Sequence, residues 1–254
     1  VFRISEVLNS IGVKTEWKKD DLIITPPKKI DIEKINKESA ERTRSCIMRI
    51  GSLIHTFKNF KLPQAGGCRL GSRTVTPYLF ALEKLGVKID TKSSHYDISH
   101  KGLKENEIIM YEAGDTVTET VLMASSLIQG KTTIKFASAN YQVQDICFYL
   151  QSLGVDIQGI GTSTLVVSGV KEINQDIEYA IGEDPIEAMS LITIAIVTGS
   201  SITIERCPID FLELELLKLE KMGFKYKIIN RYKGLNGKIN LVDIQTKKST
   251  LKAL

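Results

Sequence analysis

The chain has 254 residues, a formal net charge of +4 and an apolar fraction of 43%. These values are ordinary for a folded globular protein, and so small a charge argues against a nucleic-acid-binding class. The four cysteines lie far apart without a Cys-x-x-Cys pair, which argues against a zinc site and a disulfide framework. The cysteines therefore predict a reducing, cytoplasmic location without a bound metal, and we expect no cofactor. No apolar run has the length of a membrane span, so we expect no membrane partner, and the small charge predicts no nucleic-acid partner.

A short motif, leucine followed three positions later by an apolar residue and then glycine, recurs four times along the chain. Its glycines are Gly12, Gly86, Gly154 and Gly223, spaced by 74, 68 and 69 residues. Each copy predicts the end of an amphipathic helix, a glycine cap and then a strand. A second marker, an apolar segment closed by glycine at positions 130 and 199, repeats at a spacing of 69. Two periods that agree predict a repeat of about 70 residues.

The segments between these markers predict the content of one repeat. Residues 121–128 are apolar nearly all round, which is typical of a helix buried on every side. Residues 132–136 alternate between apolar and polar side chains, as a half-buried strand does. An amphipathic helix over 146–153 and a hairpin around the glycines at 159 and 161 complete the unit.

The next repeat starts at Asp184-Pro-Ile-Glu187, where the aspartate predicts a helix cap and the proline a first turn. The helix that follows, residues 186–197, is again apolar nearly all round, so we expect it to be buried on every side. These elements predict an α/β (α+β) fold with helices inside and sheets outside. That arrangement inverts the common one, in which helices surround a sheet.

Residues 66–73 combine three glycines, two arginines and Cys68. Glycines leave backbone N–H groups uncovered, and an arginine fork binds phosphate or carboxylate with two hydrogen bonds. A thiol beside guanidinium groups has a lowered pKa and becomes reactive. The stretch therefore predicts a loop that holds an anionic substrate against a reactive cysteine. The alternative interpretation is a glycine-rich surface turn with an inert cysteine.

The arginines are concentrated in one part of the chain. Five of the eight fall between positions 42 and 73, although the chain has 34 basic residues in all. Such a concentration favours an anion site, since arginine binds anions more specifically than lysine does. A solvated helix face explains Arg42, whereas Arg44 is either a salt-bridge partner or a ligand contact.

Four stretches together resemble the UDP-N-acetylglucosamine 1-carboxyvinyltransferases, a branch of the enolpyruvyl transferase family. They are Thr43-Arg44-Ser45, Leu62-Pro63, the Gly66-Gly67-Cys68-x-x-Gly71-x-Arg73-x-Val75 loop and Leu82-x-x-Leu85-Gly86. The resemblance covers nearly the whole chain. It implies an inside-out α/β barrel, also called an α-β prism, with three repeats in each of two domains. Residues 1–182 would be one three-repeat domain, and residues 183–254 the first repeat of the second.

The resemblance implies transfer of the enolpyruvyl group of phosphoenolpyruvate to the 3-hydroxyl of UDP-N-acetylglucosamine, with release of phosphate. This is the first committed step of peptidoglycan synthesis. Cys68 matches the family's loop cysteine, which protonates the methylene carbon and is alkylated by fosfomycin. Arg73 matches an arginine that contacts both substrates, and Arg44 one of the nucleotide-sugar site. The implied uridine contacts are Thr74, Val75, Thr76 and Pro77, and the implied diphosphate contacts are Gly114, Asp115 and Thr116.

Some positions depart from the family pattern. Its Arg-Pro-Val-Asp is Arg73-Thr-Val-Thr76 here, and the stretch that matches its Ser-Val-Gly-Ala-Thr-Glu-Asn runs from Gly114 to Thr120. The family's lysine–asparagine pair and its aspartate base would fall beyond the two ends, so we expect the chain to be inactive by itself. We also expect a monomer. A divergent or non-catalytic paralogue that binds nucleotide sugars or acts as a scaffold is the alternative. An RNA 3′-phosphate cyclase of the same fold is disfavoured by the cysteine loop and the modest charge.

Overall fold

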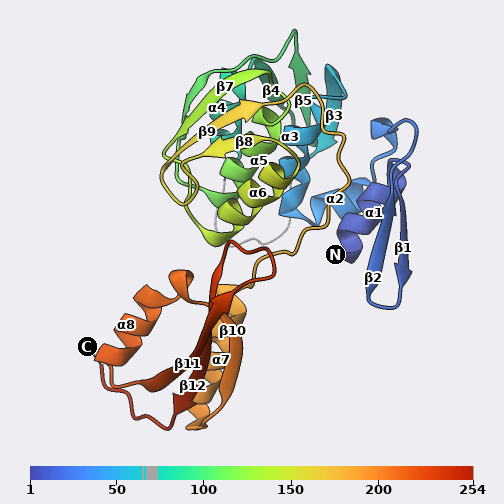
Figure 1. The fold of residues 1–254 in the computed structure, drawn as a ribbon. Coiled ribbons are helices and arrows are strands. Elements are labelled where there is room, and N and C mark those ends of the chain that lie inside the picture. The colour runs from blue at the N-terminus through green and yellow to red at the C-terminus, as the bar shows by residue number, and fades with distance from the viewer. Residues whose placement is uncertain (65, 67–73, 254) are drawn as a thin grey trace. The chain divides into compact units, whose positions relative to one another are not determined.

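The computed structural model describes residues 1–64, 66 and 74–253, with the backbone alone at Arg44. The chain forms two compact units (Figure 1). The first consists of Val1–Ala139 and Leu153–Gln175, and the second of Asn140–Ser152 and Asp176–Leu254.

The first unit contains five α-helices and nine strands among its described residues. The helices are α1 (Phe2–Ser10), α2 (Lys37–Glu41), α3 (Ile50–Leu53), α4 (Thr76–Lys84) and α5 (Asp115–Ser125), with two short 3-10 helices, η1 (Ile32–Lys34) and η2 (Arg44–Arg49). The strands are β1 (Lys14–Lys18), β2 (Asp21–Thr25), β3 (Asn59–Pro63), β4 (Val87–Thr91), β5 (His95–His100), β6 (Glu107–Ile109), β7 (Gly130–Lys135), β8 (Asp156–Gln158) and β9 (Thr164–Gly169). They form three sheets with the orders β1-β2, β3-β5-β4 and β6-β7-β9-β8.

The second unit contains a single sheet with the order β10-β12-β11. Its elements are α6 (Tyr141–Ser152), α7 (Pro185–Thr198), β10 (Thr203–Pro208), the 3-10 helix η3 (Ile209–Phe211), α8 (Glu213–Lys221), β11 (Lys225–Lys233) and β12 (Asn240–Lys247). Three groups of strands share one topology: β3-β5-β4, β7-β9-β8 and β10-β12-β11. In each group the last two strands in sequence form a hairpin, and the final strand lies in the middle, paired with both of the others. The same topology therefore recurs three times, as the sequence period predicts.

The four glycines of the repeated motif share one backbone conformation. Gly12, Gly86, Gly154 and Gly223 have φ values of 96°, 93°, 91° and 103°. Each follows the last turn of a helix and precedes the first strand of a hairpin. Side chains disfavour this region of φ, so glycine is needed at each junction. The predicted helix–glycine–strand unit is confirmed at all four sites.

Replacing Gly86 by alanine is expected to destabilise the first unit by about 1–3 kcal/mol, because the new residue would be held at positive φ. Its Cβ atom would also lie 2.8 Å from the carbonyl oxygen of Gly102. Gly102→Ala is the matched control, since a Cβ atom there has no neighbour within 4 Å. Urea denaturation of the two variants measures the difference, and equal stability losses would contradict this interpretation of the motif.

A second recurring conformation was not predicted. Phe136, just after β7, and Arg206, within β10, have φ values of 58° and 60°. At Arg206 the strand bulges, and its N–H donates a hydrogen bond to Asp243 Oδ1 at 3.0 Å. Asp243 also accepts a hydrogen bond from Tyr232 Oη at 2.6 Å. Hydrogen bonds from Tyr232 and Asn230 hold the pKa of the Asp243 carboxyl below its usual value. The carboxylate stabilises the bulge by accepting the hydrogen bond from the Arg206 N–H.

The inner helices of the first unit are buried, as predicted. Val121 and Leu122 on α5 are fully enclosed, and α5 packs against both α3 and α4. At Gly51 of α3 the two backbones nearly touch, because a Cβ atom there would lie 2.5 Å from the carbonyl oxygen of Thr120. Figure 1 shows the three-stranded and four-stranded sheets of this unit flanking these helices. The predicted arrangement of helices inside and sheets outside is confirmed here.

The prediction that residues 186–197 are buried on every side is wrong. Helix α7 begins as predicted, with the Asp184 side chain accepting a hydrogen bond from the Ile186 N–H at 2.8 Å. Only one face of α7 is covered, however, because it packs against the single sheet of its unit around Ile192. The other face exposes Ile194 and Val197, the latter to 76%. Among the described residues of this unit, no second sheet covers it.

Candidate functional site

The described residues of the predicted site lie at the starts of two helices in the first unit. Helix α4 begins at Thr76, within the predicted uridine-contacting stretch, and Thr74 Oγ1 accepts a hydrogen bond from the Thr76 N–H at 2.8 Å. Pro77 occupies the first turn, where its missing N–H has no helical partner to lose. The start of a helix carries a partial positive charge and unpaired N–H groups, which favour anions.

Helix α5 begins at the predicted diphosphate-contacting stretch. Gly114 is its N-cap, and Asp115 lies in the first turn. Asp115 Oδ1 accepts a hydrogen bond from Ser138 Oγ at 2.5 Å. The Ser138 N–H in turn donates to Thr118 Oγ1 at 3.2 Å. The carboxylate is therefore engaged with the chain beyond β7, and the first-turn N–H groups of α5 lie at the positive end of the helix dipole.

Two contacts join α4 to the chain at and just before the start of α5. Tyr78 of α4, whose side chain is buried, lies with its Oη atom 2.6 Å from Thr116 Oγ1 of α5. Nearby, the rings of Phe80 and Tyr111 are 5.5 Å apart, and both are exposed. Segments separated by nearly forty residues in sequence are thus held side by side. Tyr78, Phe80 and Tyr111 were not predicted as part of the site, because in the sequence each is an ordinary aromatic position without a motif around it.

Glu119 is a further residue that sequence reasoning missed. It follows Asp115 by one helical turn on α5 and is half-buried. Burial raises the pKa of the Glu119 carboxyl, and the neighbouring Asp115 charge raises it further. The only sequence signal is the spacing of four between two acidic residues, which places both on one face of a helix.

Three of the predicted site residues have no described side chain. Cys68 and Arg73 lie outside the described residues, and Arg44 is described by its backbone alone, at the start of η2. The described chain before the loop ends at Gln64, whose N–H donates to the carbonyl oxygen of Ser94 at 3.2 Å. After the loop it resumes at Thr74, two residues before α4. The catalytic prediction for Cys68 therefore stays a prediction.

The other cysteines are chemically inert in this fold. Cys46, Cys147 and Cys207 are free and buried. Burial raises the pKa of the Cys147 thiol to about 12 and that of Cys207 to about 11. Burial also raises the pKa of Cys46, although the nearby Arg49 opposes this effect. Few thiolates form at neutral pH at these three sites, so none is a candidate nucleophile.

Arg42 lies on a solvated helix face, as predicted. Its Nη2 atom lies 2.6 Å from Glu38 Oε1, one helical turn away, and both side chains are exposed.

The described ranges 1–64, 66 and 74–253 contain no helix with the length and apolarity needed to cross a membrane. The same ranges contain no group of three or more His, Cys, Asp or Glu side chains placed to hold a metal ion.

The sequence model of the EPSP synthase (3-phosphoshikimate 1-carboxyvinyltransferase) family matches residues 1–251. Among curated proteins, the chain is 31% identical over 253 residues to the UDP-N-acetylglucosamine 1-carboxyvinyltransferase of Thermodesulfovibrio yellowstonii, covering 97% of this chain and 59% of that protein. It is 29% identical over 221 residues to the protein of the same name from Bdellovibrio bacteriovorus, covering 87% of this chain and 53% of that one. The chain thus spans little more than half the length of these relatives.

Solved structures of low sequence identity share the fold. The enolpyruvyl transferase NikO from Streptomyces tendae superposes with a TM-score of 0.77 at 16% identity, over 97% of this chain and 57% of that one. An EPSP synthase from Acinetobacter baumannii superposes with a TM-score of 0.69 at 18% identity, over 100% of this chain and 57% of that one. These similarities confirm the predicted inside-out α/β fold.

Proposed function

The chain belongs to the EPSP synthase (3-phosphoshikimate 1-carboxyvinyltransferase) family, and from that membership we propose that it forms part of an enolpyruvyl transferase. The proposed reaction moves the enolpyruvyl group of phosphoenolpyruvate to the 3-hydroxyl of UDP-N-acetylglucosamine and releases phosphate. One observation carries the choice of acceptor. Curated relatives of 29–32% identity, matched over 80–97% of this chain, are all named for that acceptor.

The proposed chemistry is an addition followed by an elimination. The sugar hydroxyl oxygen bonds to C2 of phosphoenolpyruvate and gives its proton to a base, while C3 takes a proton from an acid. C3 then loses a proton as phosphate leaves with its bonding electrons, which restores the double bond in the product. We assign the acid role to Cys68, because a thiol beside Arg69 and Arg73 has the lowered pKa that proton transfer near neutral pH needs.

The substrates of this reaction are anions, and the proposed contacts suit them. Arg44 and Arg73 would bind the phosphate and carboxylate groups through their guanidinium forks. The start of α4, Thr74 to Pro77, is assigned to the uridine, and the start of α5, Gly114 to Thr116, to the diphosphate. Because Asp115 already accepts a hydrogen bond from Ser138, α5 would meet the diphosphate through its backbone N–H groups. The Tyr78–Thr116 contact, which holds the two segments together, supports this assignment.

We assign residues 1–182 to a three-repeat domain and residues 183–254 to the first repeat of a second domain. The exposed apolar face of α7 supports the second assignment, because the matching helix α5 uses all its faces for packing inside its own domain. Helices of further repeats would cover that face. A cytoplasmic location fits the buried free thiols of Cys46, Cys147 and Cys207, since disulfides are rare there.

Ligand binding tests the proposed acceptor. Calorimetric titration of the chain with UDP-N-acetylglucosamine should show saturable binding, and Arg73→Ala should weaken it by about tenfold or more, because it removes hydrogen bonds to charged oxygens. Arg42→Ala is the matched control, since Arg42 pairs with the exposed Glu38. If the chain binds shikimate 3-phosphate but not the nucleotide sugar, the proposed acceptor is wrong and the chain belongs to the EPSP synthase branch of the family. Binding to neither compound would favour a scaffold role.

A further inference from the structure

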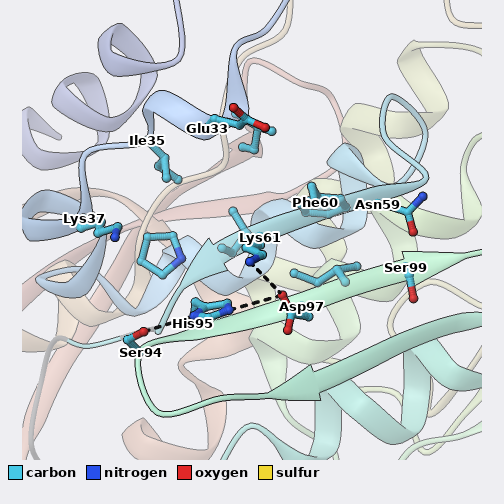
Figure 2. A pocket seen from close by; sticks show the side chains of 14 residues that line it. Glu33, Ile35, Lys37, Asn59, Phe60, Lys61, Ser94, His95, Asp97 and Ser99 are labelled. Carbon is cyan, nitrogen blue, oxygen red and sulfur yellow. Dashed lines mark hydrogen bonds and ion pairs between the residues drawn. The ribbon is translucent and has the colours of Figure 1, made fainter.

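A pocket of about 720 Å³ lies in the first unit on sheet β3-β5-β4 (Figure 2), and no residue of α4 or α5 lines it. Its floor is formed by β3 and β5, where Lys61 pairs with Asp97 and Pro63 with His95 across the strands. Its wall is the segment from Ile32 to Lys37. A volume of this size is typical of small-molecule sites. No residue of the lining belongs to the proposed enolpyruvyl transfer site.

Strand alternation divides the lining residues of β3 and β5 between the two faces of the sheet. Phe60, Leu62 and Ile98 belong to the lining but are buried. Residues between them in β3 and β5 lie on the opposite face of the sheet, since successive side chains of a strand alternate. Lys61 and Asp97 are therefore presented on the outer face, where Figure 2 shows them next to each other on the pocket floor.

The charged groups of the floor differ in how firmly they are held. Asp97 Oδ1 lies 3.3 Å from His95 Nε2, and His95 Nδ1 lies 3.1 Å from Ser94 Oγ. This chain of contacts orients the carboxylate. Lys61 Nζ lies 3.9 Å from the same carboxylate oxygen, and its side chain is 72% exposed. So long and exposed an ion pair is weak, and the lysine can turn to a ligand at little cost.

The rest of the lining adds an apolar surface and balances the charge. Ile32 and Ile35 contribute apolar side chains from the wall. Glu33 and Lys37 extend from the same segment (Figure 2). The pocket thus presents two lysines and two carboxylates beside an apolar wall. Such a lining suits a ligand that carries both charges on an apolar body better than it suits a simple anion or cation.

We propose that this pocket binds a free α-amino acid with an apolar side chain. Its carboxylate would meet Lys61, its ammonium group would meet Asp97, and its side chain would pack against Ile32 and Ile35. The two charges of an α-amino acid are carried on one carbon, so their spacing suits that of the Lys61–Asp97 pair. The pocket is independent of enolpyruvyl transfer and does not rest on the function proposed above.

Titration of the isotope-labelled chain with L-leucine and L-phenylalanine, followed by NMR, tests the proposal. The expected result is saturable shifts of the pocket residues with both amino acids. N-acetylleucine lacks the ammonium charge and leucinamide lacks the carboxylate, so both should bind more weakly by about tenfold or more. Absence of saturable shifts, or equal binding of leucine and its two blocked forms, would overturn the proposal.

Two variants separate the roles of the charges. Asp97→Asn should weaken the binding of leucine and leucinamide while leaving that of N-acetylleucine, which has no ammonium group, less changed. Lys61→Gln should weaken the binding of leucine and N-acetylleucine while leaving that of leucinamide, which has no carboxylate, less changed. Lys88→Gln is the matched control, because Lys88 forms a comparable exposed pair with Asp90 at 2.9 Å on β4, outside the pocket lining. Unchanged leucine binding in both pocket variants would also overturn the proposal. Circular dichroism of each variant verifies that the fold is retained.

Discussion

Replacing Cys68 by alanine is expected to remove the only readily alkylated thiol of the folded protein. The three other cysteines are buried, and burial raises the pKa of the Cys147 thiol to about 12. Cys68 instead has arginines at positions 69 and 73, which lower a thiol pKa and stabilise the thiolate. Brief treatment with iodoacetamide near neutral pH, followed by intact-mass measurement, should show one adduct on the unmodified sequence and none on Cys68→Ala.

Two controls make this result specific to position 68. Cys147→Ala should keep the single adduct, because its buried thiol does not react in the folded chain. In denaturant the original sequence should take up four adducts, one for each cysteine. An original chain that remains unlabelled when folded, or a Cys68→Ala variant that still gains the adduct, would show that position 68 is not the reactive thiol.

The repeat was predictable from sequence because it depends on local backbone requirements. A helix that ends in a residue with positive φ favours glycine there, so the position can be recognised in the sequence. Gly12, Gly86, Gly154 and Gly223 all adopt the expected conformation. Phe136 and Arg206 also adopt positive φ, although neither is a glycine that the sequence would identify. Non-glycine residues in this region are held there by tertiary contacts, as the bond from the Arg206 N–H to Asp243 shows. Contacts of that kind leave no local pattern.

Long-range packing explains the error at α7 and the incomplete prediction of the site. The apolar pattern of residues 186–197 predicts what the helix can bury, whereas the neighbours present in the unit determine what it does bury. In the same way, the starts of α4 and α5 were identified as separate segments. Their contact through Tyr78 and Thr116 depends on tertiary packing between positions far apart in sequence. Sequence also gave no sign of the pocket on β3 and β5, because a charged outer face is typical of any exposed sheet.

Leu122→Ala is expected to cost the first unit about 2–5 kcal/mol of unfolding free energy, because it leaves a cavity around a fully buried side chain. Leu191→Ala is the matched variant, since position 191 lies 69 residues later at the same point of the repeat. Leu122 is 0% exposed on α5, whereas Leu191 is 40% exposed on α7. The loss at Leu191 should therefore be about 1 kcal/mol, as less apolar surface is removed.

Hydrogen exchange measured peptide by peptide is the suitable method, because the two units need not unfold together. Exchange should accelerate strongly across α3, α4 and α5 in Leu122→Ala and only slightly across α7 in Leu191→Ala. Equal acceleration in the two variants would mean that α7 is as enclosed as α5, contrary to the structure.

The proposed function depends most on whether the sulfur of Cys68 lies in an arginine-lined site for a phosphorylated substrate, as we propose. The decisive measurement is the rate of Cys68 alkylation against pH, with and without phosphoenolpyruvate. We predict a thiol pKa below the value of about 8.5 found for free cysteine, together with slower alkylation when phosphoenolpyruvate occupies the site. A Cys68 pKa at or above that of free cysteine, together with an alkylation rate that phosphoenolpyruvate does not change, would contradict the proposed site.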